Sequence, residues 1–300
     1  MAKQRSLNRR DFLKITGIGA GAVFASGLHL PFAFGKDTTG DDFYFLQLSD
    51  THWGFKGPAV NPQADMTLKK TIQTVNSLSV KPDFIVFTGD LTHTTDDPKE
   101  RHARMTQFKE IVSGLNVKKV YFIPGEHDAS LDEGSAYKEH FGKTHYTFIH
   151  KGVHFIALDN VSDPEGAVGD EQIAWLKSEL SKIKKNAPIV VLTHRPLFDL
   201  MPTWDWATKD GKAVTDLLMP YQNVTVFYGH IHQENHFMTG HIPHHSAKSL
   251  VFPLPAPGSV PKKAPIPWDP TQPFKGLGFR SIEEEGGKVD EVTEYPVIKA

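Results

Sequence analysis

The chain has 300 residues, of which 39% are hydrophobic, so it is long enough to bury a sizeable core. Its 33 basic and 35 acidic residues give a net charge of −2. The chain therefore lacks the excess of basic residues that is typical of nucleic-acid-binding proteins. Cysteine is absent, which excludes disulfides, thiolate nucleophiles and sulfur-ligated zinc. Any metal must therefore bind to oxygen and to imidazole nitrogen, and 16 histidines supply the nitrogen.

The amino terminus has the form of a twin-arginine export signal. Arg9 and Arg10 precede an apolar stretch, residues 15–34, that is rich in glycine and alanine and is interrupted by Pro31. This stretch suits the apolar region of a signal peptide better than a membrane anchor. The alternative is a basic patch ahead of a core helix.

We therefore expect a signal peptide at residues 1–35 and a single domain at residues 36–300. The expected partner of the signal is the twin-arginine export machinery, and the expected location is the periplasm or the outside of the cell. No stable membrane anchor is expected after cleavage. Because this route carries folded proteins, a cofactor could be bound before export.

Strands and helices alternate through the first half of the mature chain. Apolar runs predict strands at residues 43–49, 84–86 and 119–123, and amphipathic patterns predict helices at residues 63–78 and 99–115. This alternation favours a parallel or mixed sheet packed under helices.

The second half follows the same pattern and ends in a hairpin. A proline- and histidine-rich region follows Gly240, and the part of it at residues 251–273 is expected to be ordered loop. The predicted elements are a hairpin at residues 146–149 and 153–158, a helix at 171–184, strands at 189–192 and 224–228, and a final hairpin at 278–284 and 288–295.

Five of the apolar runs are followed by residues that can bind a metal. Because the ends of neighbouring strands meet at one edge of a sheet, these residues are expected to form one metal-binding edge. Two divalent ions need several hard ligands and a bridging carboxylate, and Asp90 on the central strand is the natural bridge. Asp50 and His52 can reach one ion, and His194 and His230 can reach the second. A mononuclear zinc site would not explain five separate strand ends.

The ordered set of motifs resembles the calcineurin-like metallophosphoesterase superfamily. The set consists of Asp-x-His, Gly-Asp, Gly-x-His-Asp, a strand-end His and Gly-His-x-His, and the resemblance covers about residues 43 to 235. It implies an α/β (α+β) fold, a four-layer αββα sandwich of two mixed sheets flanked by helices. It also implies a binuclear centre that hydrolyses phosphate mono- or diesters by attack of a metal-bridging hydroxide.

The resemblance assigns the site residue by residue. His127 would donate to a phosphoryl oxygen or protonate the leaving group, and Asp128 would orient the His127 imidazole. The two ions would be Fe, Mn or Zn, and the substrate would be a small-molecule phosphate ester. The first ion would bind Asp50, His52, Asp90 and His232, and the second Asp90, Glu126, His194 and His230.

Glu126 departs from the family pattern, which has Asn at this position. With Asp50, Asp90 and a bridging hydroxide, Glu126 would leave two divalent ions in a site of about zero net charge, where Asn would leave about one positive charge. Our hypothesis is that Glu126 alters the choice of metal or substrate, for example towards a trivalent–divalent pair. The alternative is a tolerated variation.

Two further residues are candidates on their position alone. His93 stands where purple acid phosphatases carry a tyrosine ligand to ferric iron, so it could bind the first metal or the substrate, or be only a loop histidine. Arg195, beside His194, could contact a phosphate oxygen, although a surface salt bridge is an equal alternative.

Two other classes of protein are compatible with these residues. An iron-binding or redox protein on the same scaffold could have lost hydrolysis, although the pair His127-Asp128 argues for catalysis. A binding protein could instead capture phosphate-containing ligands without turnover.

Overall fold

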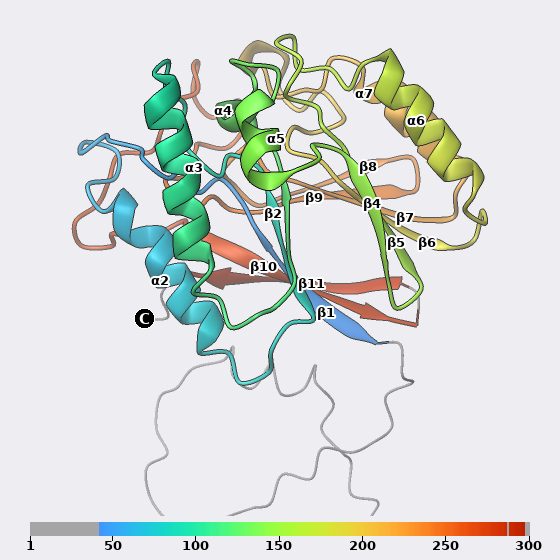
Figure 1. The fold of residues 1–300 in the computed structure, drawn as a ribbon, viewed down its shortest axis with the longest axis horizontal. Coiled ribbons are helices and arrows are strands. Elements are labelled where there is room, and N and C mark those ends of the chain that lie inside the picture. Colours follow the sequence, from blue (N-terminus) through green and yellow to red (C-terminus); the bar gives the residue numbers. More distant parts are fainter. Residues whose placement is uncertain (1–41, 287, 298–300) are drawn as a thin grey trace, which may run out of the picture. The chain divides into compact units, whose positions relative to one another are not determined.

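The computed structural model describes residues 42–286 and 288–297, which belong to a compact unit that spans Asp41–Ala300. The predicted export signal lies outside the described residues. The described strands form two mixed sheets (Figure 1). The first has the order β11 (Lys288–Pro296), β10 (Gly278–Glu285), β1 (Phe43–Leu48), β2 (Phe84–Thr88) and β3 (Val120–Ile123). The second has the order β4 (Tyr146–His150), β5 (Val153–Ala157), β6 (Pro188–Leu192), β7 (Asn223–Tyr228), β9 (Ile242–Ser246) and β8 (Asn235–Thr239).

Both sheets have a parallel centre and antiparallel edges. Strands β1, β2 and β3 run parallel, as do β5, β6, β7 and β9. The antiparallel pairs are β1–β10 and the hairpins β10–β11, β4–β5 and β8–β9. Parallel neighbours end at the same edge of a sheet, and this arrangement brings the predicted ligands together.

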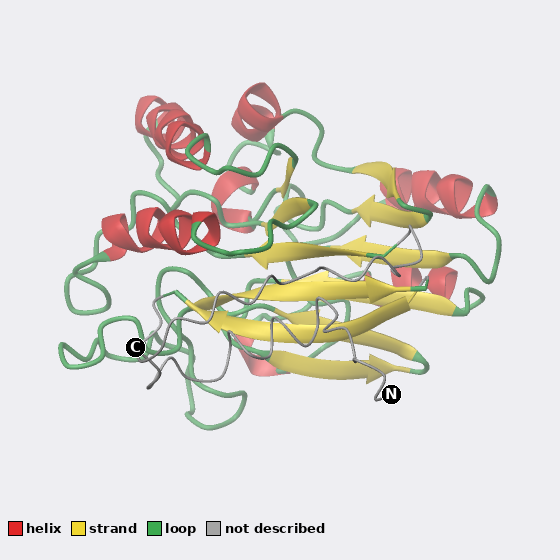
Figure 2. Cartoon of the chain, turned by 90° about the horizontal axis from the view of Figure 1, so that it is seen from below, coloured by secondary structure: helices red, strands yellow, loops and turns green. Residues whose placement is uncertain are grey.

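Helices cover the outer face of each sheet (Figures 1 and 2). Helices α2 (Ala64–Asn76), α3 (Pro98–Val112) and α5 (Ser135–Phe141) share a core with the first sheet, and α6 (Asp170–Ser181) and α7 (Gly211–Leu218) share one with the second. A third core lies between the sheets. The predicted four-layer αββα sandwich is confirmed.

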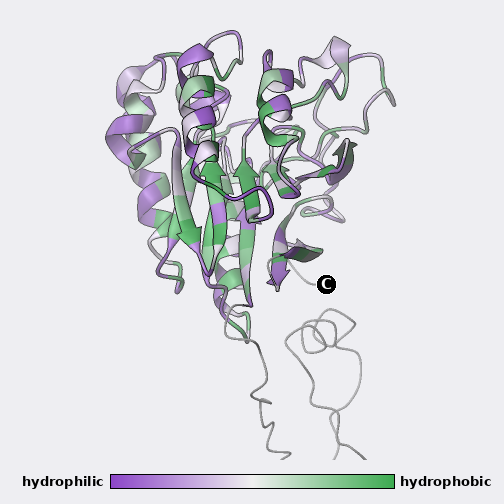
Figure 3. Ribbon diagram, turned by 90° about the vertical axis from the view of Figure 1, so that its right-hand side faces the viewer, coloured by the Kyte–Doolittle hydropathy of each residue, from purple (hydrophilic) through white to green (hydrophobic). Residues whose placement is uncertain are grey.

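Alternation along the buried strands explains why each sheet packs on both faces. In β1, Phe43 and Phe45 enter the core between the sheets, whereas Tyr44 and Leu46 face the helices. Figure 3 shows the apolar strands inside and the polar sides of the helices outside. Strands buried on both faces read as continuous apolar runs, which is why the sequence predicts them.

Local signals explain several of the helices. Asp97 caps α3, because its carboxylate accepts hydrogen bonds from the backbone N–H groups of Lys99 (2.9 Å) and Glu100 (3.4 Å) and Pro98 opens the helix. The predicted helices are present with ends shifted by up to three residues. Among the described residues, no helix is both long and apolar enough to cross a membrane.

The sequence analysis missed several short elements. Helix α4 (Glu126–Ala129), α5, α7 and the hairpin β8–β9 were not predicted. Strand β9 contains Pro243 and two histidines, so it lacks the apolar run of a central strand, yet it pairs with β7. Its position depends on partners distant in the sequence.

The aromatic cluster between the sheets yields a stability prediction. Phe155 is fully buried and packs against Phe45 at 5.6 Å, Phe84 at 5.3 Å and Phe148 at 4.6 Å between ring centroids. We expect Phe155→Ala to lower the free energy of unfolding by about 3–5 kcal/mol, measured by urea denaturation, because it leaves a cavity between the sheets. Ile149→Ala, whose side chain is 65% exposed, is the control and should change it by no more than about 0.5 kcal/mol. Equal effects of the two substitutions would contradict this account of the core.

Candidate metal centre

The predicted ligands follow the carboxyl ends of the parallel strands. Asp50 and His52 follow β1, Asp90 follows β2, and Glu126 opens α4 after β3. The second sheet contributes residues after β6 and β7, namely His194, His230 and His232. The structure therefore brings residues from both sheets to one site.

Five of these residues adopt a backbone conformation that side chains rarely tolerate. Their φ angles are 54° for Asp50, 43° for His52, 49° for Asp90, 66° for His230 and 54° for His232. The described part of the chain has only three other non-glycine residues with positive φ. Each such residue costs of the order of 1–3 kcal/mol, and such strain concentrates at functional sites.

The first ligand group lies around Nε2 of His52. His52 Nε2 is 3.3 Å from Asp90 Oδ2 and 3.2 Å from His232 Nε2, and His232 Nε2 is 3.3 Å from Asp50 Oδ1. All four residues are buried, and their ligand atoms lie within 4.8 Å of one another. They converge as the ligands of one ion would.

The second ligand group is centred on Glu126. Its Oε2 is 2.8 Å from His194 Nε2, and its Oε1 is 2.8 Å from His230 Nδ1. Asp90 Oδ2 is 3.4 Å from the same His194 nitrogen. The Asp90 oxygen therefore faces both groups, as a bridging ligand must.

Backbone carbonyls hold two of the imidazoles in position. His194 Nδ1 lies 2.7 Å from the carbonyl oxygen of Thr88, and His232 Nδ1 lies 2.8 Å from that of Phe252. Each contact places a proton on Nδ1, so Nε2, which points into the site, carries the lone pair that a metal would bind in place of a proton. This is the usual arrangement of a histidine that binds a metal.

The donor set fits divalent cations. Glu126 Oε2, His194 Nε2 and His230 Nδ1 are buried, and among the described residues their 2.8 Å contacts with each other's side chains lack the geometry of hydrogen bonds. The carboxylates of Asp50 and Asp90 are also buried, and within the described residues neither forms an ion pair with Lys or Arg. These carboxylates contact histidines instead, and hard oxygen and imidazole ligands suit divalent cations such as Fe, Mn or Zn.

Burial and the neighbouring charges shift the pKa values of several residues in the site. Burial lowers the pKa of His194, but Asp90 and Glu126 raise it by more, so it lies well above its ordinary value. Burial raises the pKa of Glu126, but His230 and His194 bring it well below its ordinary value. Burial, and then the charges of His127, His232 and His93, hold the pKa of His52 well below its ordinary value.

His127 lies at the edge of the first group. Its ring is 4.5 Å from that of His52 and 4.8 Å from that of His93, measured between centroids. Its Nδ1 accepts a hydrogen bond from the backbone N–H of Thr94 at 3.2 Å. The neutral ring therefore carries its proton on Nε2, which remains available as a donor.

Asp128 does not orient His127, so this part of the sequence prediction is wrong. The Asp128 carboxylate accepts hydrogen bonds from the backbone N–H groups of Leu91 (2.9 Å), Thr92 (2.8 Å) and Gly125 (3.0 Å). Adjacent residues on helix α4 point in different directions, which turns Asp128 away from the His127 ring. Burial, and then Asp90, raise the pKa of Asp128 to about 6. Asp128 fixes the loop that follows Asp90.

His93 lies behind His52 rather than among the first ligand group. Its Nδ1 is 3.2 Å from His52 Nδ1, whereas the carboxylates surround His52 Nε2. Burial, and then the charge of His127, lower the pKa of His93 to about 4. His93, His52 and His127 also have ligand atoms within 4.8 Å of one another, so a contact of His93 with a metal or with the substrate stays a prediction.

Arg195 binds the loop at residues 205–207 through its guanidinium group. Its Nε donates to the carbonyl of Ala207 at 2.9 Å, and its Nη2 contacts the carbonyl of Asp205 at 2.8 Å and the Asp205 carboxylate at 2.6 Å. The side chain is 9% exposed. The structure thus contains the salt bridge that was the alternative for Arg195, and a contact of Arg195 with a phosphate oxygen stays a prediction. The carbonyl of Asp205 lies 3.4 Å from His230 Nε2.

Two supporting residues were missed by the sequence analysis. The side-chain oxygen of Asn160 accepts hydrogen bonds from the backbone N–H groups of His194 (3.2 Å) and Arg195 (3.3 Å), so it shapes the turn after β6. Phe252 orients His232 through its carbonyl, and its ring packs against His232 at 4.7 Å and His52 at 5.8 Å. No local signal distinguishes either residue, because each acts on ligands distant in the sequence.

A cavity of about 380 Å³ adjoins the centre at Phe252. Its walls include Val60, Ile266 and Trp268, and the Nε1–H of Trp268 is buried without a hydrogen-bond partner among the described residues. A mostly apolar cavity with a buried donor that has no partner among the described residues suits the organic part of a small molecule.

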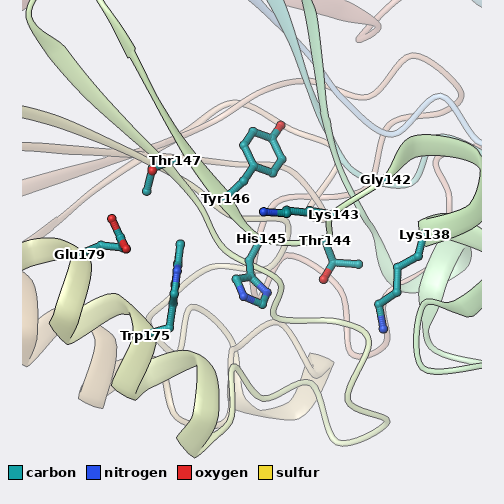
Figure 4. Close-up of a pocket in the computed structure, with 9 residues that line it drawn as sticks. All are labelled: Lys138, Gly142, Lys143, Thr144, His145, Tyr146, Thr147, Trp175 and Glu179. Carbon is teal, nitrogen blue, oxygen red and sulfur yellow. The ribbon is translucent and has the colours of Figure 1, made fainter.

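A larger cavity, of about 630 Å³, lies between the segment that joins α5 to β4 and helix α6 (Figure 4). Lys143, His145, Trp175 and Glu179 are among its lining residues, and the His145 and Trp175 rings lie 4.7 Å apart. None of the predicted ligands lines it. We therefore do not assign it to catalysis.

Comparisons with known proteins agree with this site. The family model for calcineurin-like phosphoesterases matches residues 43–234. A probable glycerophosphodiester phosphodiesterase of Arcobacter nitrofigilis is 28% identical over 200 residues, which cover 63% of this chain and 71% of the relative. A probable cyclic nucleotide phosphodiesterase of Rhodococcus erythropolis is 26% identical over 70% of this chain and 71% of its own length.

Solved structures share the fold at low sequence identity. A dimetal phosphatase of Danio rerio superposes with a TM-score of 0.58 and 12% identity over 85% of this chain and 99% of its own. A purple acid phosphatase of yellow lupin gives a TM-score of 0.60 and 14% identity over 84% of this chain and 53% of its own. The chain belongs to the calcineurin-like phosphoesterase family, and it is a metal-dependent phosphoesterase.

The position of Asp128 leads to a prediction that separates it from His127. Asp128→Asn replaces an acceptor oxygen by an amide that cannot accept the same backbone hydrogen bonds. We expect it to lower the free energy of unfolding by about 1–3 kcal/mol, measured by denaturant titration. His127→Ala should change stability by about 0.5 kcal/mol or less, because that ring is only partly buried. A full-stability Asp128→Asn variant would contradict the loop-fixing role.

Proposed function

We propose that the chain hydrolyses phosphate mono- or diesters of small molecules at a binuclear metal centre. The observation that carries this proposal is the position of Asp90 Oδ2, which is 3.3 Å from His52 Nε2 and 3.4 Å from His194 Nε2. One carboxylate oxygen thus faces ligands from both groups. The relatives named as phosphodiesterases support the reaction class.

The two ligand groups would hold one ion each. When bound, two divalent ions supply positive charge for the phosphoryl oxygens and lower the pKa of a water molecule so that it can attack phosphorus. The residues that hold them are Asp50, His52, Asp90 and His232 for the first ion, and Asp90, Glu126, His194 and His230 for the second.

His127 would supply the proton for the leaving group. Its Nδ1 is occupied by the N–H of Thr94, so the Nε2–H is the group that it can offer to the departing alkoxide or a phosphoryl oxygen. Its partly buried ring, beside but outside the two ligand groups, suits contact with substrate.

Glu126 would adjust the charge of the centre. Both of its oxygens lie 2.8 Å from a histidine of the second group, so the anionic side chain occupies the position that the family pattern gives to a neutral Asn. Burial lowers the pKa of the half-buried Lys263, and the charge of Glu126 opposes this shift. We propose that Glu126 changes which metal pair is bound.

Export completes the proposal. The twin-arginine sequence at the amino terminus supports transport by the twin-arginine machinery to the periplasm or beyond, with the phosphoesterase released from its signal. Detection of the processed protein in a periplasmic fraction, and its loss from that fraction when Arg9 and Arg10 are both replaced by Lys, would test this step.

The central test is hydrolysis by the metal-loaded protein. The mature chain, loaded with Fe, Mn or Zn, should hydrolyse a chromogenic phosphomonoester or diester, and chelation should abolish the activity. We expect His127→Ala to lower kcat by about 100-fold or more, because it removes the proton donor. Glu126→Asn should change the ratio in which the three metals are retained, measured by elemental analysis.

The exposed His236 provides a matched control, because it belongs to neither ligand group. His236→Ala should leave kcat and metal content unchanged. Stoichiometric metal binding without turnover for all three metals would contradict the proposal. It would favour a redox protein if the bound iron cycles between valences, or a phosphate-binding protein if phosphate binds tightly.

The cavity beside Phe252 predicts which esters bind well. Ile266→Trp should fill part of this cavity and raise KM roughly tenfold for a diester with two aromatic groups, while kcat for a small phosphomonoester is retained. The control is Val260→Trp, which changes a residue of the same loop that is 38% exposed and does not line the cavity. Equal KM values for the two variants would exclude this cavity as the site of the organic group.

A further inference from the structure

A group of metal-binding side chains lies outside the centre described above, on the surface where α3 meets α5. His102 belongs to α3, and Glu139 and His140 belong to α5. None of them is among the predicted ligands, and the proposed hydrolysis uses none of them.

The ligand atoms of this group already lie close to metal-binding geometry. His102 Nδ1 is 2.9 Å from His140 Nε2 and 3.9 Å from Glu139 Oε2, and the three atoms lie within 4.8 Å of one another. Neighbouring ligand atoms around a tetrahedral zinc are about 3.3 Å apart, given zinc–nitrogen bonds of about 2.0–2.1 Å. Small side-chain adjustments would therefore suffice.

The site is open to solvent, and other contacts between the two segments hold its backbone in place. The side chains of His102 and Glu139 are 40% and 71% exposed, so an ion can reach them. A hydrogen bond from Lys109 Nζ to the His140 carbonyl at 2.6 Å joins α3 to α5, and an ion pair at 2.8 Å joins Arg101 of α3 to Asp132 in the turn before α5. The backbone positions of the ligands are thus fixed without an ion.

The ligand types of this group also suit a metal. Two imidazoles and one carboxylate form a ligand set typical of zinc, and they leave a position for water.

We propose that His102, Glu139 and His140 form a separate surface site for zinc, or for a divalent ion with the same preference for nitrogen, that links α5 to α3. Helix α5 follows α4, which carries Glu126 and His127, so an ion at this site tethers the segment that supplies both residues. Zinc binding here is independent of the proposed hydrolysis.

Without a metal, the same contacts would be a hydrogen bond between two imidazoles beside an exposed carboxylate. The two cases differ in a measurable way. A hydrogen-bonded pair retains no zinc, whereas a three-ligand site removes one equivalent from solution and holds α5 more firmly.

The test compares zinc content between the full chain and single-site variants. After zinc loading and dialysis, His102→Ala and His140→Ala should each bind one zinc equivalent fewer than the unaltered protein. His154→Ala, which changes a partly buried histidine of β5 outside every group of candidate ligands, is the control and should bind the same amount. Because the result is a difference, it does not depend on how much metal the main centre binds.

Hydrogen exchange supplies a second, local measurement. Zinc should slow exchange of the α5 amides at residues 135–141 in the unaltered protein and not in His102→Ala. Glu139→Gln, at an exposed position that tolerates substitution, should bind the extra zinc more weakly without loss of fold. Equal zinc content in His102→Ala, His140→Ala and the unaltered protein would overturn the proposal, as would zinc that dissociates equally from all three during dialysis. If hydrolysis fails but the histidine variants lose zinc, only the proposed function is refuted.

Discussion

The structure depends on several buried carboxylates that lie close together where the two sheets meet. Asp90 follows β2 of the first sheet, and its Oδ2 contacts both His52 of the same sheet and His194 of the second at 3.3 Å and 3.4 Å. A buried carboxylate is costly without positive charge, which bound cations would supply beside the histidines. The aromatic core between the sheets fixes the separation of the strands, and thereby the spacing of the ligands.

Several of the candidate ligands have a strained backbone conformation. Asp50, Asp90 and His230 all have positive φ, and such positions persist only where the surroundings determine them. Hydrogen bonds supply that support, since Asp50 accepts from the backbone N–H of His230 at 3.1 Å and Asp128 holds the loop after Asp90. The ligands of the two sheets are thus locked to each other by backbone contacts as well as by the ions they would share.

Glu126 distinguishes this chain from the family pattern, which has Asn at this position. The carboxylate meets His194 and His230 at 2.8 Å, and their charges bring its pKa well below the ordinary value. An anion in this position reduces the positive charge that two divalent ions would otherwise present to a phosphate. In the proposed function, the metal pair and the preferred ester would therefore be linked through one side chain, and the apolar cavity beside Phe252 would bind the organic part of the substrate separately.

The sequence by itself determined the layers and the candidate ligands, because both follow from local order along the chain. Continuous apolar runs specify strands buried on two faces, and the residues that follow Leu48, Thr88 and Leu192 must lie at the ends of those strands. Only the tertiary structure decided the contacts of Asp128, His93 and Arg195, since side-chain direction depends on helix geometry and on partners far away in the sequence. It likewise decided the pairing of β9 with β7 and the contact of Phe252 with His232, because long-range packing carries no signature in the local pattern.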